Sequence, residues 1–235
     1  MKEPDISEIN RHLEVDGFCI LNKFVTGKKL LSVDREFDKM IELTSYNEGI
    51  VTDVSDDLFF KNIRLKQKDL SHYQLHEINS IFYCDLFKQV SNHFFDKAEH
   101  AFNFDFFLNQ TKGKKEWLGY AFDPHFDKRH TLKFFLYLND VSARNGALAV
   151  EPGSHEKNRI LRHKLIKEKI PYPEWPSIFK LSKDIIPIEA EAGSLIIFDT
   201  DTTHHAGQID EGEIRKIIRS HCRAHYVMEM EKKLA

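Results

Sequence analysis

The sequence has few cysteines and no long apolar run. The 235 residues contain three cysteines, at positions 19, 84 and 222, and these are too far apart to form a CxxC motif. We therefore expect neither a disulfide framework nor a cysteine-based zinc site. No run of 18 apolar residues predicts a membrane span, and the polar start of the chain does not resemble a secretory signal. These absences predict a cytoplasmic protein with reduced thiols and no membrane partner.

The sequence also lacks a strong excess of charge of either sign. Lys and Arg number 34 against 37 Asp and Glu, which gives a net charge of −3. A nucleic-acid-binding protein is usually basic, so we expect no nucleic-acid partner. Hydrophobic residues at 41% and charged residues at 30% are typical of a globular protein rather than a disordered or coiled-coil one. The length predicts a single domain, residues 1–235, with a self-sufficient core.

Residues 1–115 are predicted to form a mainly helical flank. Apolar residues recur at helical spacing from Ile6 to Leu13 and from Leu30 to Leu43, and Leu75 to Phe104 is a longer apolar region of helical type. The run from Phe18 to Leu21 predicts a strand. No motif with a chemical meaning occurs in this half of the chain.

The pattern changes after Trp117, where short β-type runs alternate with Gly, Pro and Asn turns. The runs are Leu132–Leu138, Ala147–Val150, Ser194–Phe198 and Ile214–Cys222. This spacing predicts an antiparallel double-stranded β-helix, a cupin-like jelly roll, over residues 115–228, within a mostly β fold with flanking helices.

A basic segment interrupts these runs. Residues 156–183 contain eight Lys or Arg and three acidic residues and are predicted to lie outside the barrel. Two interpretations remain open. The segment is either a lid that attracts an anionic substrate or a helix with an ordinary solvated basic face.

A candidate metal site begins with His125 and Asp127. In a strand, residues i and i+2 point to one face, so the imidazole and carboxylate converge. Alone, this HxD pattern also suits a surface pair. A second histidine, His204 or His205, follows a later strand. Two histidines and one carboxylate form the facial triad of non-haem Fe(II) enzymes. Arg215 lies eleven residues after His204, in a β-type run, and a buried arginine there can clamp a carboxylate.

The ordered set of motifs resembles the phytanoyl-CoA dioxygenase family of Fe(II)- and 2-oxoglutarate-dependent oxygenases. The resemblance covers residues 117–225, with a similar opening at residues 16–18. The segments that carry it are His125–Asp127, Phe134–Val141, Asn145–Leu148, Glu151–His155, Gly193–Phe198, His204–Gly207 and Arg215. The order of these motifs is far more specific than HxD alone.

The resemblance implies a role for each residue of the site. His125, Asp127 and His204 would be the iron ligands, and Arg215 would bind the distal carboxylate of 2-oxoglutarate. The family's distal motif, His, any residue, a small residue and Gly, favours His204 over His205.

Two further positions bear on how the cosubstrate is held. Ala206 stands where many members have serine, so one hydroxyl contact to the cosubstrate is missing. Lys133, in phase with Phe135 and Tyr137, is either a cationic partner that replaces this contact or a solvated strand lysine. Arg219 is the alternative to Arg215.

The resemblance further implies hydroxylation of a C–H bond in a small-molecule substrate, and the lid interpretation of residues 156–183 would make this substrate anionic. The cofactor would be Fe(II), with 2-oxoglutarate and O2 as cosubstrates and succinate and CO2 as co-products. Asp127 disfavours halogenation, because related halogenases have a small residue at that position. Two alternatives remain: a cupin-type metalloenzyme that does not use 2-oxoglutarate, and a catalytically inactive member that binds a metal or ligand. The sequence does not predict an oligomeric state.

Overall fold

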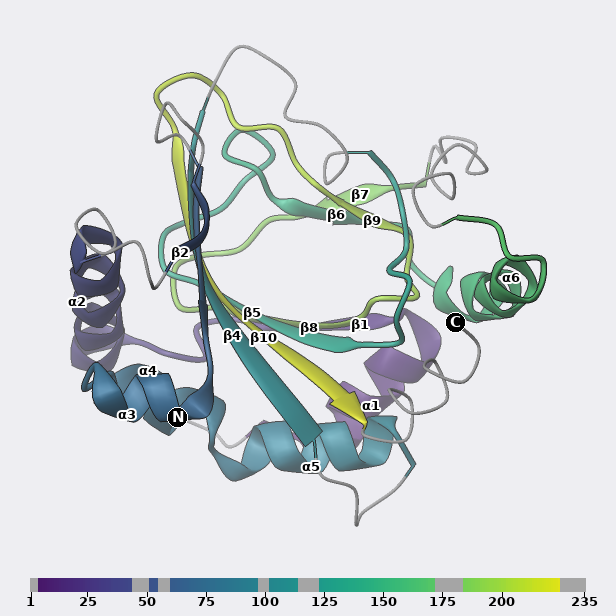
Figure 1. Ribbon diagram of the computed structural model, residues 1–235, viewed down its shortest axis with the longest axis horizontal. Helices are drawn as coiled ribbons and strands as arrows, with labels where there is room; N and C mark the ends of the chain where they lie inside the picture. Colours follow the sequence, from purple (N-terminus) through teal and green to yellow (C-terminus); the bar gives the residue numbers. More distant parts are fainter. Residues whose placement is uncertain are drawn as a thin grey trace.

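Two antiparallel sheets face each other, and helices lie around them (Figure 1). The computed structural model describes residues 4–43, 51–54, 60–96, 102–113, 123–171 and 184–224. The larger sheet has seven strands in the order β1-β8-β5-β10-β4-β3-β2. The smaller sheet has three, in the order β7-β6-β9. This arrangement confirms the predicted mostly β jelly roll with flanking helices.

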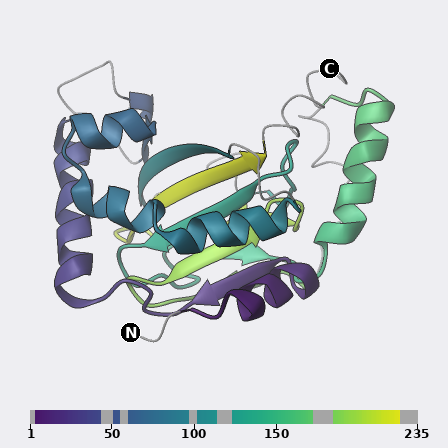
Figure 2. The same ribbon diagram turned by 90° about the horizontal axis from the view of Figure 1, so that it is seen from below.

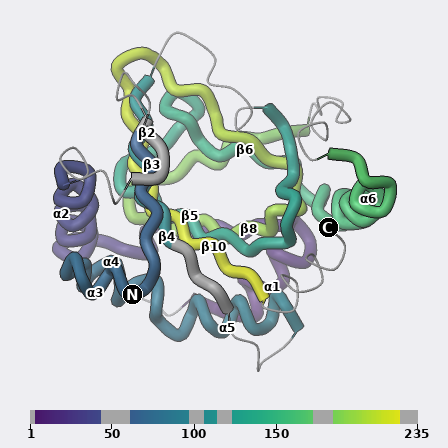
Figure 3. Tube along the Cα trace, in the orientation of Figure 1, coloured from purple at the N-terminus to yellow at the C-terminus, as the bar shows by residue number. Residues whose placement is uncertain are grey.

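The strands of the larger sheet come from both halves of the chain. They are β1 (Phe18–Leu21), β2 (Val51–Val54), β3 (Phe60–Leu65), β4 (Phe102–Lys112), β5 (Leu132–Tyr137), β8 (Leu195–Asp199) and β10 (Ile214–Ala224). The smaller sheet consists of β6 (Leu148–Val150), β7 (Ile186–Ile188) and β9 (His204–Ala206). Strand β10 runs between β5 and β4 and pairs with both over most of its length (Figure 3). It is therefore a central strand whose inward side chains face the smaller sheet.

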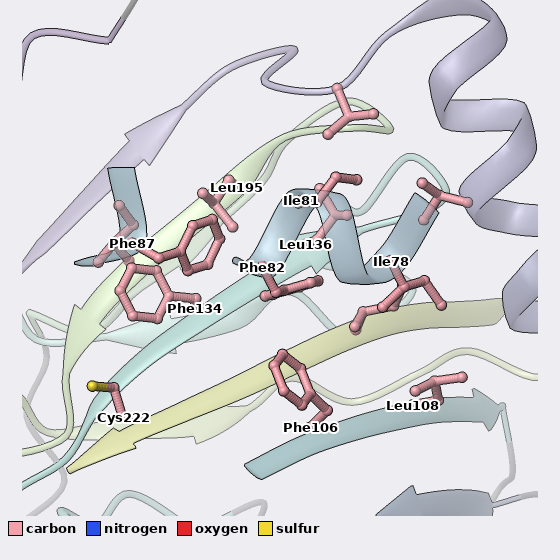
Figure 4. Close-up of a cluster of buried hydrophobic side chains, with 14 of the residues drawn as sticks. Ile78, Ile81, Phe82, Phe87, Phe106, Leu108, Phe134, Leu136, Leu195 and Cys222 are labelled. Carbon is pink, nitrogen blue, oxygen red and sulfur yellow. The ribbon is translucent and has the colours of Figure 1, made fainter. Parts of the chain in front are cut away.

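Five helices lie on the outer side of the larger sheet (Figure 2). They are α1 (Ile6–Val15), α2 (Gly27–Leu43), α3 (Gln67–His72), α4 (His76–Phe82) and α5 (Asp85–Phe94). Their apolar faces pack on outward side chains of the sheet (Figure 4). Phe87 of α5 lies 4.4 Å from Phe134 of β5, and Phe82 of α4 lies 5.5 Å from Phe106 of β4, both measured between ring centroids. Six of the 19 phenylalanines are buried in this outer core.

A second core fills the space between the two sheets. Strand β5 illustrates the division, because its alternate residues face opposite sides. Phe134 and Leu136 join the outer core, whereas Phe135 and Tyr137 join the inner one. Lys133 lies on the same face as Phe135 and Tyr137, as the sequence phase predicted. The side chains that pack around this inner core are therefore held in place.

The first 115 residues contribute more to the sheet than a helical flank would. Four strands, β1 to β4, belong to the seven-stranded sheet. The region from Leu75 to Phe104, predicted to be helical, contains α4 and α5 and then enters β4 at Phe102. The reason lies in the spacing. Phe102, Phe104, Phe106 and Leu108 alternate with a period of two, which is the strand period, but the first two of them were assigned to the apolar helical region before them.

The basic segment begins with a sixth helix, α6 (His155–Lys167), at one side of the barrel (Figure 1). Residues 172–183 of the segment, including Tyr172 and Trp175, lie outside the described residues. Two arginines of α6 contact buried carboxylates, as described below, so its basic face is not simply solvated. None of the helices in the described part of the chain has the length and apolar character needed to cross a membrane. All three cysteines are free thiols.

A glycine in the left-handed region of backbone conformation directly precedes strand β1. Gly17 has φ +80°, and its carbonyl accepts hydrogen bonds from the Asp199 N–H at 2.9 Å and from Thr202 Oγ1 at 3.3 Å. A Cβ at this position would lie 2.2 Å from Thr202 Oγ1. Glycine is therefore required where the N-terminal strand approaches the loop between β8 and β9.

Candidate metal centre

His125 and His204 are brought together by their backbones. The His204 N–H donates to the His125 carbonyl at 2.7 Å, and the His125 N–H donates to the His204 carbonyl at 3.0 Å. The Asp127 N–H donates to the Thr200 carbonyl at 3.0 Å. The HxD motif was expected to lie in a regular strand. It lies instead ahead of β5, where His125 forms an isolated bridge with His204. The side chains still converge, because this bridge fixes the same extended geometry.

The three predicted ligand side chains form one compact group, which we call the His125 cluster (His125, Asp127 and His204). Asp127 Oδ1 lies 3.9 Å from His125 Nε2 and 3.6 Å from His204 Nε2. One potential ligand atom from each residue lies within 4.8 Å of the others. Both histidines are buried, with 8% and 4% of their surfaces exposed. This spacing fits three ligands on one face of a metal ion.

Hydrogen bonds define which nitrogen of each histidine faces the carboxylate. His125 Nδ1 lies 2.7 Å from the Asp123 carbonyl, and His204 Nδ1 lies 2.8 Å from the Thr202 carbonyl. A carbonyl oxygen only accepts, so each Nδ1 carries the proton and each Nε2 keeps its lone pair. Burial lowers the pKa of both imidazoles, that of His204 to about 3. Both are therefore neutral at physiological pH, as metal ligands must be.

Asp127 is held in its ionised form. Burial alone would raise its pKa, but Lys133 and then His204 and His125 outweigh burial, and the pKa is lowered to about 2. Lys133 Nζ lies 2.7 Å from Asp127 Oδ2. Lys133 forms this ion pair with only 11% of its side chain exposed, so its interpretation as a solvated strand lysine is wrong. Two neutral imidazoles and one carboxylate with a free Oδ1 fit Fe(II) and related divalent metals.

The other two predicted residues lie differently. His205 is outside the His125 cluster, and its Nδ1 lies 3.0 Å from the Ala206 carbonyl. Arg215 is buried on β10, with its Nη1 donating to the Gly146 carbonyl. Its Nε has no acceptor in the described part of the chain. Burial lowers the pKa of Arg215, and burial followed by the Arg215 charge lowers that of Arg219 to about 10.

A second cluster of the same residue types lies nearby and was not predicted. We call it the His130 cluster (His130, Asp199 and Asp201). His130 Nδ1 lies 2.9 Å from Asp201 Oδ2 and 3.6 Å from Asp199 Oδ1. Arg159 of α6 contacts Asp199 at 2.8 Å and Asp201 at 3.2 Å, and Arg162 also pairs with Asp201. Its only sequence signal was the pair of aspartates just before His204.

Helix α6 also holds the backbone of that loop. Asn158 Nδ2 donates to the Asp201 carbonyl and to Thr203 Oγ1, each at 2.8 Å. The Thr203 N–H donates to Ser154 Oγ at 2.8 Å. The loop 200–203 leads directly into His204, and its Thr200 and Thr202 carbonyls accept hydrogen bonds from the Asp127 N–H and from His204 Nδ1. The helix therefore supports the loop on which the His125 cluster depends.

Comparison with known proteins places the chain in a family. Residues 13–217 match the family model for phytanoyl-CoA dioxygenase (PhyH). No curated protein matches the sequence.

Solved structures share the fold at low sequence identity. EctD from S. alaskensis, solved with 2-oxoglutarate and 5-hydroxyectoine, superposes with a TM-score of 0.66 at 15% identity, covering 95% of this chain and 78% of its own. The carbocyclase SnoK from nogalamycin biosynthesis gives 0.64 at 14%, covering 94% and 84%. The epimerase SnoN, in complex with Fe3+, alpha ketoglutarate and nogalamycin RO, gives 0.59 at 14%, covering 92% and 82%. The family match and the fold together show that the chain belongs to the phytanoyl-CoA dioxygenase family of enzymes that use iron and 2-oxoglutarate.

Proposed function

We propose that His125, Asp127 and His204 bind Fe(II), that Arg215 binds the distal carboxylate of 2-oxoglutarate, and that the enzyme hydroxylates a C–H bond of a small molecule. The observation that carries this proposal is the convergence of two neutral Nε2 atoms and one carboxylate oxygen within 4.8 Å. When bound, iron supplies the oxidising chemistry, with 2-oxoglutarate and O2 consumed and succinate and CO2 released.

The chain's own residues orient the ligand atoms. The carbonyls of Asp123 and Thr202 fix the tautomers of the two histidines. Lys133 binds Asp127 Oδ2 and so leaves Oδ1 directed at the two imidazoles. The support is geometric: each ligand side chain is held by a second group of the protein. Lys133 therefore positions Asp127. A contact between Lys133 and 2-oxoglutarate stays a prediction.

Arg215 is suited to a carboxylate because its guanidinium is buried without one. Its one protein acceptor is a neutral carbonyl, and its Nε has no acceptor in the described residues. A buried guanidinium is costly unless a counter-charge compensates it. A carboxylate of the cosubstrate satisfies the fork in a bidentate manner.

Aromatic rings line the inner face beside the proposed ligands and keep water out. Phe198 lies 5.2 Å from the His204 ring and 5.1 Å from Phe135, measured between centroids. The molecules named in the EctD and SnoN structures, 5-hydroxyectoine and nogalamycin RO, are small. They support a small-molecule substrate for this chain as well.

Anaerobic addition of Fe(II) and 2-oxoglutarate tests the proposal directly. We expect the weak visible charge-transfer band of the chelate in the wild-type protein and in His205→Ala, and no band in His204→Ala. Absence of the band from folded, metal-loaded wild-type protein would favour the cupin-type metalloenzyme that does not use 2-oxoglutarate. A band without succinate formation in air, with any of a panel of small molecules, would favour the inactive ligand-binding member.

A further inference from the structure

Strand β10 presents two inward arginines, whereas the cosubstrate requires one. Arg215 and Arg219 are four residues apart and share one face of the strand, which separates their Cα atoms by about 13 Å. In the proposed function, 2-oxoglutarate uses Arg215 at its distal end and the metal at the other. Arg219 is left without a role in binding it.

The surroundings of Arg219 are those of an incomplete binding site. Its guanidinium carbon lies 5.2 Å from the centroid of Phe107 and 5.8 Å from that of Phe135. One Nη donates to Asn62 Oδ1 at 2.7 Å, while the buried Nε has no acceptor within the described ranges. No carboxylate of the described residues forms an ion pair with it. The Arg219 side chain is half-buried, and a guanidinium partly removed from water and given one neutral acceptor is unfavourable unless another group compensates it.

Positive charge accumulates around this position. His221, also on β10, packs 4.5 Å from Phe107, and burial holds its pKa well below the usual value. Four cations lower that pKa further: Lys133, Arg219, Arg223 and Arg64. Asp127, whose charge opposes the lowering of the Arg219 pKa by burial and by Arg215, forms its ion pair with Lys133. Several cationic side chains therefore gather on this part of the inner face.

We propose that Arg219 binds an anionic group, a carboxylate or a phosphate, of the primary substrate, between Phe107 and Phe135. This inference rests on the proposed function, because it assumes that Arg215 is occupied by the cosubstrate. A planar guanidinium that lies against aromatic rings keeps its edge available for bidentate contact. Phe135 contacts Phe198, which contacts His204. An apolar part of the substrate, lying along these rings, extends from the anion toward the metal.

Binding of model anions tests the inference without knowledge of the natural substrate. The probes are benzoate and phenyl phosphate, with benzyl alcohol as the neutral analogue. Each is titrated calorimetrically into protein loaded with Mn(II) and saturating 2-oxoglutarate. We expect wild-type protein to bind at least one anion in preference to the alcohol, and Arg219→Gln to bind it about tenfold or more weakly. The preferred anion identifies the carboxylate or the phosphate.

Matched variants separate the site from general electrostatics. Lys216→Gln removes the same charge from the outer face of β10, where Lys216 pairs with Asp34 and Asp38 of α2, and is expected to bind the anion as wild type does. Arg219→Lys retains the charge without the fork and is expected to bind with intermediate affinity. Both provide a folded comparison if Arg219→Gln is destabilised.

The affinity for 2-oxoglutarate, measured on the same proteins, separates the two proposals. Loss of anion binding in Arg219→Gln with unchanged 2-oxoglutarate affinity supports the inference. Failure of wild type to bind either anion, or equal binding by wild type and Arg219→Gln, overturns the inference alone. Failure of wild type to bind 2-oxoglutarate overturns the proposed function. If Arg219→Gln loses 2-oxoglutarate while Arg215→Lys keeps it, the two roles are exchanged and the inference is overturned.

Discussion

Two clusters of histidine and aspartate lie close to one another, but their surroundings differ. In the His125 cluster, both Nε2 atoms and Asp127 Oδ1 face each other, and one lysine holds the remaining oxygen. In the His130 cluster, Arg159 and Arg162 contact the carboxylates that a metal would need. Similar residue types therefore serve different ends. The first cluster keeps ligand atoms available, and the second neutralises buried charge.

The arginines show the same contrast. Arg162 is buried against the carboxylate of Asp201, so its charge is compensated within the protein. Arg215 is equally buried but has a neutral carbonyl as its acceptor. A buried cation with a counter-charge is a structural element, whereas a buried cation without one indicates a site for an anion that the chain does not supply.

The largest expected effect separates the two clusters by activity. His204→Ala removes a proposed iron ligand and is expected to reduce 2-oxoglutarate-dependent succinate formation by about 1,000-fold or more, because the metal supplies the oxidising chemistry. His130→Ala, the matched change in the other cluster, is expected to retain most of the activity. Equal loss in both variants, with metal content preserved, would contradict the distinction. Succinate release and metal content are the measurements.

The arginine contrast predicts opposite effects on stability. Arg162→Met leaves the Asp201 carboxylate buried with weaker compensation and is expected to lower the free energy of unfolding by about 3–5 kcal/mol. Arg215→Met leaves no carboxylate unpaired and is expected to be nearly neutral or stabilising in protein free of 2-oxoglutarate. Urea denaturation of both variants, without cosubstrate, measures the difference. Equal destabilisation would show that Arg215 has a structural role.

The affinity for cosubstrate sharpens the assignment of Arg215. Arg215→Lys keeps the charge and loses the planar fork, so we expect the apparent KM for 2-oxoglutarate to rise, equivalent to about 1.5–3 kcal/mol for a lost charged hydrogen bond. Steady-state kinetics over a range of 2-oxoglutarate concentrations gives this value. An unchanged KM in Arg215→Lys, together with a raised KM in Arg219→Lys, would transfer the role to Arg219.

The smallest effect concerns pH and a residue outside both clusters. His221 has a pKa well below its usual value, through burial and then the charges of Lys133, Arg219, Arg223 and Arg64. Since the unfolded chain binds this proton more readily, the stability that the neutral histidine provides is complete above about pH 6.5 and falls as the pH is lowered. Between pH 6.5 and 5 the loss is up to about 2 kcal/mol. His221→Gln is expected to show a shallower decline in urea titrations, and an identical slope would contradict the burial of a neutral His221.

The sequence predicted the jelly roll and the three side chains of the His125 cluster. It did not predict strand β4 or the His130 cluster beside them. The His125–Asp127 spacing is set by local chain geometry, and His204 was found from the order of the family motifs, because a bridge between residues far apart in the chain brings it to His125. Strand β4 was missed because its first phenylalanines were assigned to the apolar helical region before it, although the mostly polar residues 96–101 separate the two. Asp199 and Asp201 were missed because their partners, Arg159 and Arg162, lie some 40 residues away in the chain. Such pairing is determined by tertiary contacts that a linear pattern does not contain.

The glycine that opens β1 bears on the order in which the protein folds. The carbonyl of Gly17 and the hydroxyl of Thr202 that contacts it are separated by 185 residues in the chain. During synthesis the N-terminal strand therefore leaves the ribosome long before its partner β8 and the loop that leads to His204 exist. Contacts of such long range form late and slowly. We therefore expect β1 to pair only after β8 has been made, and the loop before His204 to gain its contact with Gly17 late in folding.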